Sequence, residues 1–223
     1  MKAKIIVTMI LISLISLFAC SKALSSDNLK DEESINKLLQ DFTEAAKEKN
    51  ADNIIQYFDL QEYVDGYNLE MAKKDFGDNA KRPAYEEKHR RMVNQYVTFL
   101  IGFTLTDANK EQNILKDIDI KLQQLNLEDL TIERIDVPNE QQTRTDNFKN
   151  ILKTRCKKYG AESITFRTVL YRCGTQTYYC GFELRKYNGT WKIDELRASL
   201  TNVDVNIVIQ PVSEKEYLKI IGK

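Results

Sequence analysis

The sequence predicts an α+β fold in which N-terminal helices pack on a curved antiparallel sheet, with extra helices in the middle and at the C-terminus. Apolar residues recur every three or four positions through most of residues 31–159, as on one face of a helix. From Ser163 onward the period becomes two, as in strands with one buried face. Asn188-Gly189, a preferred sequence for a two-residue hairpin turn, separates two such segments.

The N-terminal segment is expected to be an export signal. Lys2 and Lys4 precede a largely apolar run over residues 5–18. As a helix this run would span about 21 Å, which is shorter than a hydrocarbon core of about 30 Å. A short positive region followed by such a run is typical of a signal peptide.

The end of this run indicates where the signal is cut. Leu17-Phe18-Ala19-Cys20 resembles the lipobox of bacterial lipoprotein precursors, although Phe18 departs from the small or β-branched residue usual at its position. The resemblance implies that residues 1–19 are removed and that the Cys20 thiol carries a diacylglycerol. Several acyl chains would hold the protein on a membrane durably. The alternative is an ordinary signal peptide cut nearby.

The remainder is expected to form a tether and one domain outside the cytoplasm. Residues 20–30 comprise the lipidated cysteine and a polar, Ser-rich linker, and residues 31–223 form a single α+β domain. Ser21 carries no acidic retention signal, so the outer membrane is favoured if the cell has two membranes.

The helices follow in chain order from periodicity and end signals. A helix from Ile35 to Ala46 is followed by a short one that carries Ile54 and Phe58, for which Asp52 is the expected cap. Pro83 suits the first turn of a long helix that reaches residue 103. Further helices are expected over residues 110–124 and 146–159, the second with Asp146 as its cap.

The strands follow from alternation and turn residues. Segments are expected over residues 130–137, 163–170, 178–184 and 203–209. The Asn188-Gly189 turn places Leu184 opposite Ile193 on the returning strand. Ser213 and Glu216 have the spacing of a capping box, which predicts a terminal helix.

Two stretches resemble the nuclear-transport-factor-like superfamily of α+β domains. "INKLLQDFTEAAKEKNADNIIQYFD" looks like its first helical pair, and "YYCGFELRKYNGTWKIDEL" is similar to its late hairpin. The resemblance implies a cone-like domain. It does not imply one activity, because this superfamily includes isomerases and dehydratases, binding modules and oligomerisation domains.

Three cysteines remain once Cys20 is assigned to the anchor. If the turn near Gly174 has three residues, Cys180 joins the apolar face of the sheet and a Cys156–Cys180 disulfide is the preferred pairing. A two-residue turn would invert the side-chain parity and favour Cys173 instead. Buried free thiols are the alternative to any disulfide.

His89 is the single histidine, so the sequence assigns no catalytic set and no metal site. In the superfamily's isomerases and dehydratases, buried Asp, Tyr or His groups act on a small substrate. An enzyme of that kind would need His89 inside a closed pocket with a carboxylate within hydrogen-bond reach. A partly buried position on its helix is the alternative. A glycine-rich phosphate loop is not found, and no cofactor is expected.

Charge and aromatic residues indicate the expected partners. Basic and acidic residues number 33 each, and Lys2 and Lys4 lie in the leader, so the exported part is slightly acidic and nucleic acid is not expected as a partner. Two basic clusters, at 88–91 and 153–158, are solvated helix faces or contacts to anionic lipid. Ligand-lining positions, with core packing as the alternative, are expected at Tyr57, Phe58, Tyr96, Phe103, Phe166, Phe182 and Trp191.

These features predict a membrane-anchored lipoprotein that acts as a non-catalytic binding or interaction module. Its partner would be an envelope protein or a small apolar ligand held in the cone. The alternatives are an isomerase- or dehydratase-like enzyme that uses His89, and a structural component of an envelope assembly.

Overall fold

The computed structural model describes residues 28–77, 80–101, 126–196 and 209–223. The chain divides into Met1–Leu39 and Gln40–Lys223, and the sheet and every site discussed below belong to the second part. None of the helices in the described segments combines the length and the apolar character needed to cross a membrane. Cys20, the expected helix over 110–124 and most of the strand over 203–209 lie outside the described residues.

The helical first half agrees with the periodicity of the sequence. A helix covers residues 28–47. It is followed by α2 (Ala51–Ile55), α3 (Leu60–Gly66), α4 (Leu69–Phe76) and the long α5 (Arg82–Ile101). The cap of α2 is Asn50 rather than the predicted Asp52, because the Asn50 backbone is extended and its side chain accepts from the backbone N–H groups of Asp52 and Asn53.

The second half alternates short helices with strands. A 3-10 turn η2 (Leu127–Asp129) leads into β1 (Thr131–Asp136), which is followed by α8 (Glu140–Thr143) and α9 (Asp146–Tyr159). Thr145 caps α9 in place of the predicted Asp146, since its side chain accepts from the Phe148 N–H. Then come β2 (Ser163–Cys173), β3 (Gln176–Tyr187), β4 (Thr190–Leu196), β5 (Gln210–Pro211) and α10 (Glu214–Ile220).

The α+β class with an antiparallel sheet is confirmed. The strand order is β1-β2-β3-β4, and β5 pairs with β3 beyond the end of β4. The Asn188-Gly189 hairpin is confirmed, with Leu184 opposite Ile193. The capping box at α10 is also confirmed, because Ser213 accepts from the Glu216 N–H and the Glu216 carboxylate accepts from the Ser213 N–H.

The β2–β3 turn has two residues, Gly174 and Thr175, so Cys173 pairs with Gln176. Leu170 therefore lies opposite Tyr179, and Cys180 lies opposite Val169. The three-residue turn on which the preferred disulfide depended is thus not formed. A shift of one residue moves every following side chain to the other face of the sheet.

This register contradicts the predicted Cys156–Cys180 bridge. Cys156 packs with Ile164 and Phe166, which share one face of β2. Cys180 pairs with Val169, whose side chain points to the opposite face. Among the described residues Cys156, Cys173 and Cys180 are free thiols, and Cys180 is buried on the face away from Cys156.

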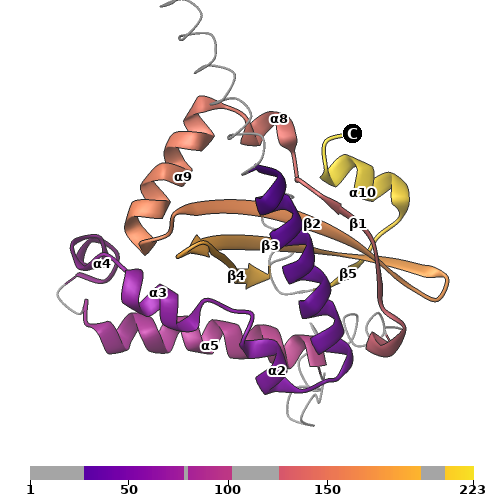
Figure 1. The fold of residues 1–223 in the computed structure, drawn as a ribbon, viewed down its shortest axis with the longest axis horizontal. Coiled ribbons are helices and arrows are strands. Elements are labelled where there is room, and N and C mark those ends of the chain that lie inside the picture. Colours follow the sequence, from indigo (N-terminus) through magenta and orange to yellow (C-terminus); the bar gives the residue numbers. More distant parts are fainter. Residues whose placement is uncertain (1–27, 78–79, 102–125, 197–208) are drawn as a thin grey trace, which may run out of the picture. The chain divides into compact units, whose positions relative to one another are not determined.

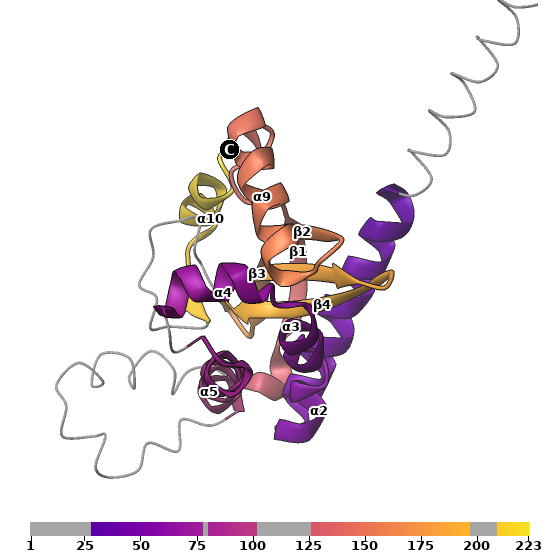
Figure 2. The same cartoon turned by 90° about the vertical axis from the view of Figure 1, so that its left-hand side faces the viewer.

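Helices cover the sheet on the face of Ile164 and Phe166. α9 packs there through Phe148, Leu152 and Cys156, and α10 packs on Leu170 and Tyr179. In Figures 1 and 2, α9 lies above the strands, while α3 and α5 lie below β4. The chain that enters α3 runs beside β4 in a short parallel bridge between Phe58 and Ile193. This bridge fixes the start of α3 against the sheet edge.

Candidate functional site

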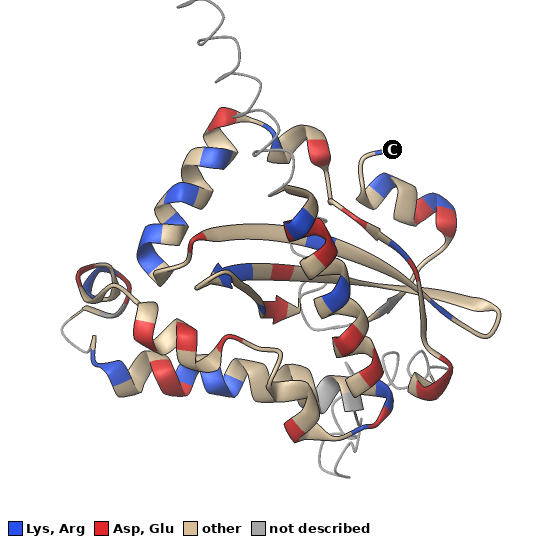
Figure 3. Cartoon of the chain, in the orientation of Figure 1, with Lys and Arg blue, Asp and Glu red and all other residues tan. Residues whose placement is uncertain are grey.

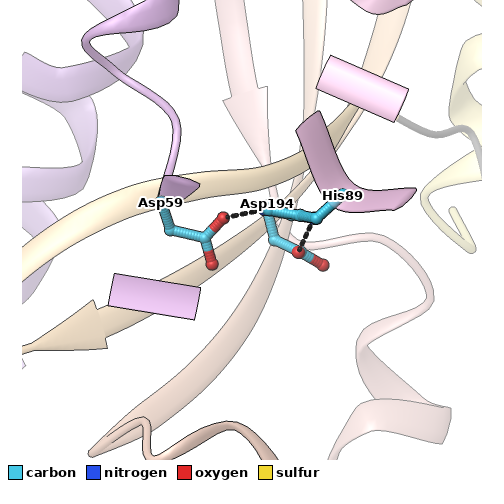
Figure 4. Close-up of side chains that lie close together, drawn as sticks. All are labelled: Asp59, His89 and Asp194. Carbon is cyan, nitrogen blue, oxygen red and sulfur yellow. Dashed lines mark hydrogen bonds and ion pairs between the residues drawn. The ribbon is translucent and has the colours of Figure 1, made fainter. Parts of the chain in front are cut away.

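A buried histidine lies between two aspartates from different parts of the chain (Figure 4). His89 on α5 places its Nε2 at 2.8 Å from Oδ1 of Asp59, which is the residue before α3. Its Nδ1 lies at 3.9 Å from Oδ1 of Asp194 on β4. All three side chains are at most 2% exposed. Because a carboxylate accepts hydrogen bonds, the Asp59 contact places a ring proton on Nε2.

Asp59 is held rigidly from both sides. Its backbone N–H donates to the Ile193 carbonyl at 3.0 Å, so the edge of the sheet fixes its main chain. The Tyr187 hydroxyl donates to its Oδ2 at 3.0 Å. Burial raises the pKa of Tyr187, and the nearby Asp59 charge raises it further, so this hydroxyl keeps its proton. Asp59 therefore orients the His89 ring.

A β-bulge delivers the second aspartate. Leu184 pairs with Ile193 and the next pair is Glu183 with Glu195, so Asp194 is an extra residue in β4. Glu183 lies on the same face of β3 as Arg185. The bulge therefore leaves two successive acids of β4 on that face, where the carboxylates of Glu183, Asp194 and Glu195 lie within 4.8 Å of one another.

Arg185 connects these acids. Its Nη2 donates to Asp194 at 2.5 Å and to Glu183 at 3.1 Å, and its Nη1 lies 3.6 Å from Asp59. The guanidinium also lies over the Tyr159 ring, with Cζ at 3.7 Å from the ring centroid. The side chain is only 2% exposed, and both its Nε and its Nη1 lack a hydrogen-bond partner.

We call the following six residues the buried charge cluster: Asp59, His89, Arg155, Glu183, Arg185 and Asp194. Arg155 reaches in from α9 and donates to Glu183 at 2.5 Å. The Glu195 carboxyl, also buried, lies within 4.8 Å of Glu183 and Asp194 beside this cluster. Acids therefore outnumber the two guanidinium groups in this buried region, and protonation of such interacting acids belongs to the group as a whole.

The pKa values of Glu183 and Asp194, the two acids that share Arg185, are shifted in opposite directions. Burial raises the pKa of Glu183, but Arg155 and Arg185 outweigh burial and hold it below its usual range. Burial raises the pKa of Asp194 well above its usual range; the charge of Arg185 opposes this, and the charges of Asp59 and Glu183 raise the pKa further. Two neighbouring carboxyls with opposite shifts are a common property of acid–base sites.

Three residues of the cluster line a cavity of about 770 Å³. These are His89, Arg185 and Asp194, and three tyrosines, Tyr63, Tyr67 and Tyr159, line the same cavity. Tyr63 stacks on the His89 imidazole at 3.9 Å between ring centroids and 10° between planes. Tyr63 also packs on Tyr159, with centroids 5.5 Å apart.

A polar contact between α4 and α9 forms another part of the cavity lining. Asp75 forms an ion pair with Lys158 and accepts a hydrogen bond from the Tyr67 hydroxyl at 2.7 Å. The hydrogen bond from Lys158 lowers the pKa of Asp75, so this carboxylate stays ionised at neutral pH. The Lys158 ammonium also lies over the Tyr159 ring at 5.3 Å.

Two glycines set the spacing of these tyrosines. A Cβ at Gly66 would lie 2.2 Å from the Tyr159 carbonyl oxygen, and a Cβ at Gly160 would lie 2.7 Å from the Gly66 Cα. The ends of α3 and α9 therefore meet backbone to backbone, and the Asn68 N–H donates to the Lys158 carbonyl at 2.8 Å. Larger side chains would separate the helices that carry the cavity walls.

Asp59, His89 and Asp194 also form a conceivable metal ligand set, since one donor atom from each lies within 4.8 Å of the others. Imidazole with two carboxylates suits several divalent metals. However, Arg185 already supplies positive charge between the two aspartates. A divalent cation would lie beside this guanidinium, so the donor set is less suited to a metal than its composition indicates.

The aromatic residues expected to line a ligand site lie elsewhere. Phe58 and Phe182 pack edge-on against Phe42, and Tyr96 stacks on Phe58. The remaining described members fill other parts of the structure or its surface, and none of the described members lines the 770 Å³ cavity. Phe103 lies outside the described residues. The complete predicted set was Tyr57, Phe58, Tyr96, Phe103, Phe166, Phe182 and Trp191.

For two of the site residues that sequence reasoning missed, the sequence pattern was misleading. Glu183 and Arg185 alternate with Phe182 and Leu184, a pattern that indicates one solvated face. α9 instead covers that face, and both charged residues are buried. The tyrosines at 63, 67 and 159 gave no periodic signal beyond their helices. Asp59 supplies the carboxylate within hydrogen-bond reach of His89 that the enzyme hypothesis requires.

Comparison with known proteins gives information on the fold. Neither a protein-family model nor a curated protein matches the sequence. A solved structure of a cystatin-like protein from Ruminococcus gnavus ATCC 29149 is similar, with a TM-score of 0.50 and 16% identity. The similarity covers 85% of this chain and 47% of the other, so the chain spans about half the length of that protein. At this identity the likeness supports the α+β fold alone.

Proposed function

We propose that this protein is a membrane-anchored lipoprotein whose domain binds a small polar molecule in the cavity above the buried charge cluster. The observation that carries the proposal is Arg185, which is 2% exposed, lines the cavity and has two nitrogens without hydrogen bonds. Buried donors without partners are costly and rare in folded proteins. A ligand that accepts from Arg185 would remove this cost.

The dimensions and lining of the cavity support the same proposal. Sites for small molecules typically measure about 300–1,000 Å³ and combine aromatic walls with a few fixed polar groups. Here Tyr63 and Tyr159 supply the walls, and His89, Arg185 and Asp194 supply the polar groups. This composition favours a polar ligand over the apolar ligand expected from the sequence.

Acid–base catalysis is the second candidate, and the His89–Asp59 contact of 2.8 Å favours it. Asp59 holds a proton on Nε2, which leaves Nδ1 facing the Asp194 side of the cluster. Asp194, whose pKa is raised by burial, can hold a proton beside this nitrogen. A base and an acid side by side can move a proton between two positions of one bound molecule.

The location and the finer fold assignment rest on sequence features. The run that ends at Leu17-Phe18-Ala19-Cys20 supports lipid anchoring outside the cytoplasm, at the outer membrane if the cell has two membranes. The helix over 28–47 with α2, and the β3–β4 hairpin, support a cone-like nuclear-transport-factor-like domain. The additional helices α9 and α10 extend that plan.

A cavity-blocking variant tests ligand binding. Gln95 is exposed at the cavity lining, while its neighbour Asn94 is exposed and does not line it. A library of polar fragments would be screened by ligand-observed NMR against wild type, Gln95→Trp and Asn94→Trp. Fragments should bind wild type and Asn94→Trp alike and lose about tenfold in affinity on Gln95→Trp. A screen without any fragment sensitive to Gln95→Trp would contradict the proposal.

The same fragments test catalysis, and labelling tests the anchor. In D2O, NMR should show deuterium entering a C–H position of a bound fragment with wild type and not with His89→Asn. If both proteins exchange equally, His89 is not the base. Fatty-acid labelling should mark wild type and not Cys20→Ala, and equal labelling would exclude Cys20 as the anchor.

A further inference from the structure

The outward face of α9 carries a row of lysines. Lys149, Lys153 and Lys157 are spaced by four residues and are all exposed. At 100° per residue they lie within an arc of about 80°, and they extend over about 12 Å of helix. We call these three residues the α9 basic stripe. Figure 3 shows blue residues along α9, with red at its first turn only.

The stripe has little acidic compensation. Lys149 lies 3.5 Å from Asp146, which is 97% exposed, and α9 contains no other acid. Neither Lys153 nor Lys157 has an ion-pair partner among the described residues. Exposed cations of a helix can pair with acids three or four residues away, as Arg90 and Arg91 do on α5. Most of the positive charge of the stripe is therefore not neutralised by the described residues and can attract an external partner.

The cations on the inner side of α9 form ion pairs within the domain. Arg155 binds Glu183 of the buried charge cluster, and Lys158 binds Asp75 in the cavity lining. The helix thus has an inner basic side engaged by the domain and an outer one that the domain leaves unused. Replacing the outer lysines removes none of the contacts that form the cavity.

We propose that the α9 basic stripe binds the anionic headgroups of the bilayer that holds the protein. This rests on the proposed lipid anchor, which would keep the domain within a tether length of that surface. A positively charged row complements a surface of anionic lipid, and three lysines near such a surface favour contact by about a hundredfold. The domain then lies with α9 toward the lipid, and the inner side of the same helix connects that surface to the cavity.

Energy transfer from Trp191, the single tryptophan, tests this docking. The purified full chain would be combined with vesicles that contain a dansyl-labelled lipid, in phosphatidylcholine alone or with about 30% phosphatidylglycerol. Transfer should increase with phosphatidylglycerol and fall back in about 1 M salt, where the Debye length is about 3 Å. The increase should be lost in Lys149→Gln/Lys153→Gln/Lys157→Gln. It should persist in Lys73→Gln/Lys215→Gln/Lys219→Gln, which removes the same charge from exposed positions on α4 and α10.

Amine labelling gives a local readout of the same contact. With phosphatidylglycerol present, acetylation of Lys153 and Lys157 should slow about fivefold, while Lys73 and Lys215 should react unchanged. Equal labelling in both lipids, or equal transfer in both triple variants, would overturn the proposal and leave an acidic protein as the stripe's partner. Flotation with pure phosphatidylcholine vesicles reports the anchor separately, because that lipid offers no net charge to the stripe.

Discussion

Gly66→Ala should destabilise the protein, because α3 and α9 meet at this residue. The new Cβ would lie 2.2 Å from the Tyr159 carbonyl oxygen and 3.3 Å from the Gly160 Cα, and both are backbone atoms. Overpacking of this kind costs about 1–3 kcal/mol. Separating the helices also weakens the hydrogen bond from Asn68 to Lys158, worth about 1 kcal/mol. Greater helix propensity returns at most about 1 kcal/mol, so the net loss is about 2 kcal/mol.

Urea unfolding followed by the tyrosine near-UV signal measures this loss. With a slope of about 2 kcal/mol per molar urea, the midpoint should fall by about 1 M. Gly174→Ala is the control, because its φ is +58° but nothing lies within 4 Å of a Cβ there. Backbone strain alone should cost it about 1 kcal/mol, and a fragment that binds the cavity should still bind. If Gly66→Ala unfolds at the wild-type urea concentration, the backbone contact between α3 and α9 is refuted.

Three further predictions concern the buried charge cluster and the thiols. Asp59→Asn should lower the unfolding free energy by about 1–3 kcal/mol, since His89 and Tyr187 lose a charged acceptor, whereas Asp65→Asn at an exposed ion pair should leave the melting temperature unchanged. Asp194 has a raised pKa when folded, so it stabilises the fold at low pH and loses that contribution as pH rises above about 3.8, its unfolded value. The deficit of Asp194→Asn relative to wild type should therefore shrink between pH 4 and pH 8 in urea titrations, and a deficit that grows would reverse the assigned shift. Alkylation under denaturing conditions without reductant should modify Cys156, Cys173 and Cys180, and the half-buried Cys156 should be the first to react in the native protein. Recovery of a single modified cysteine among these three would show that a disulfide forms.

Much of the fold follows from local patterns, because helix periodicity and the Asn188-Gly189 turn depend on neighbouring residues. The β2–β3 register did not follow, since the segment around Gly174 permits loops of two or three residues. The difference of one residue in loop length determines the face of the sheet on which Cys180 lies. Turn length is thus the step at which the disulfide prediction was wrong.

The site was only partly predictable for a different reason. His89 was identified as the residue that needs a carboxylate partner, yet Asp59 and Asp194 lie 30 or more residues away on other elements. Nothing in a period of two or 3.6 indicates which acid reaches the ring. Glu183 and Arg185 have the alternation of a solvated strand face, and they are buried because each charge finds an opposite charge under α9.

Because Asp194 is the extra residue of a β-bulge, its carboxylate could be removed from the site without changing how the rest of β4 pairs with β3. Ile193 remains opposite Leu184 and Leu196 remains opposite Phe182 on either side of the extra residue. Deleting Asp194 would therefore shorten β4 to a regular ladder and keep its apolar side chains on their present face. The cluster would then lose the one carboxyl whose pKa burial raises, and it would keep the contacts of Arg155 and Arg185 with Glu183. A single codon thus separates a site with an acid beside Nδ1 of His89 from one without it.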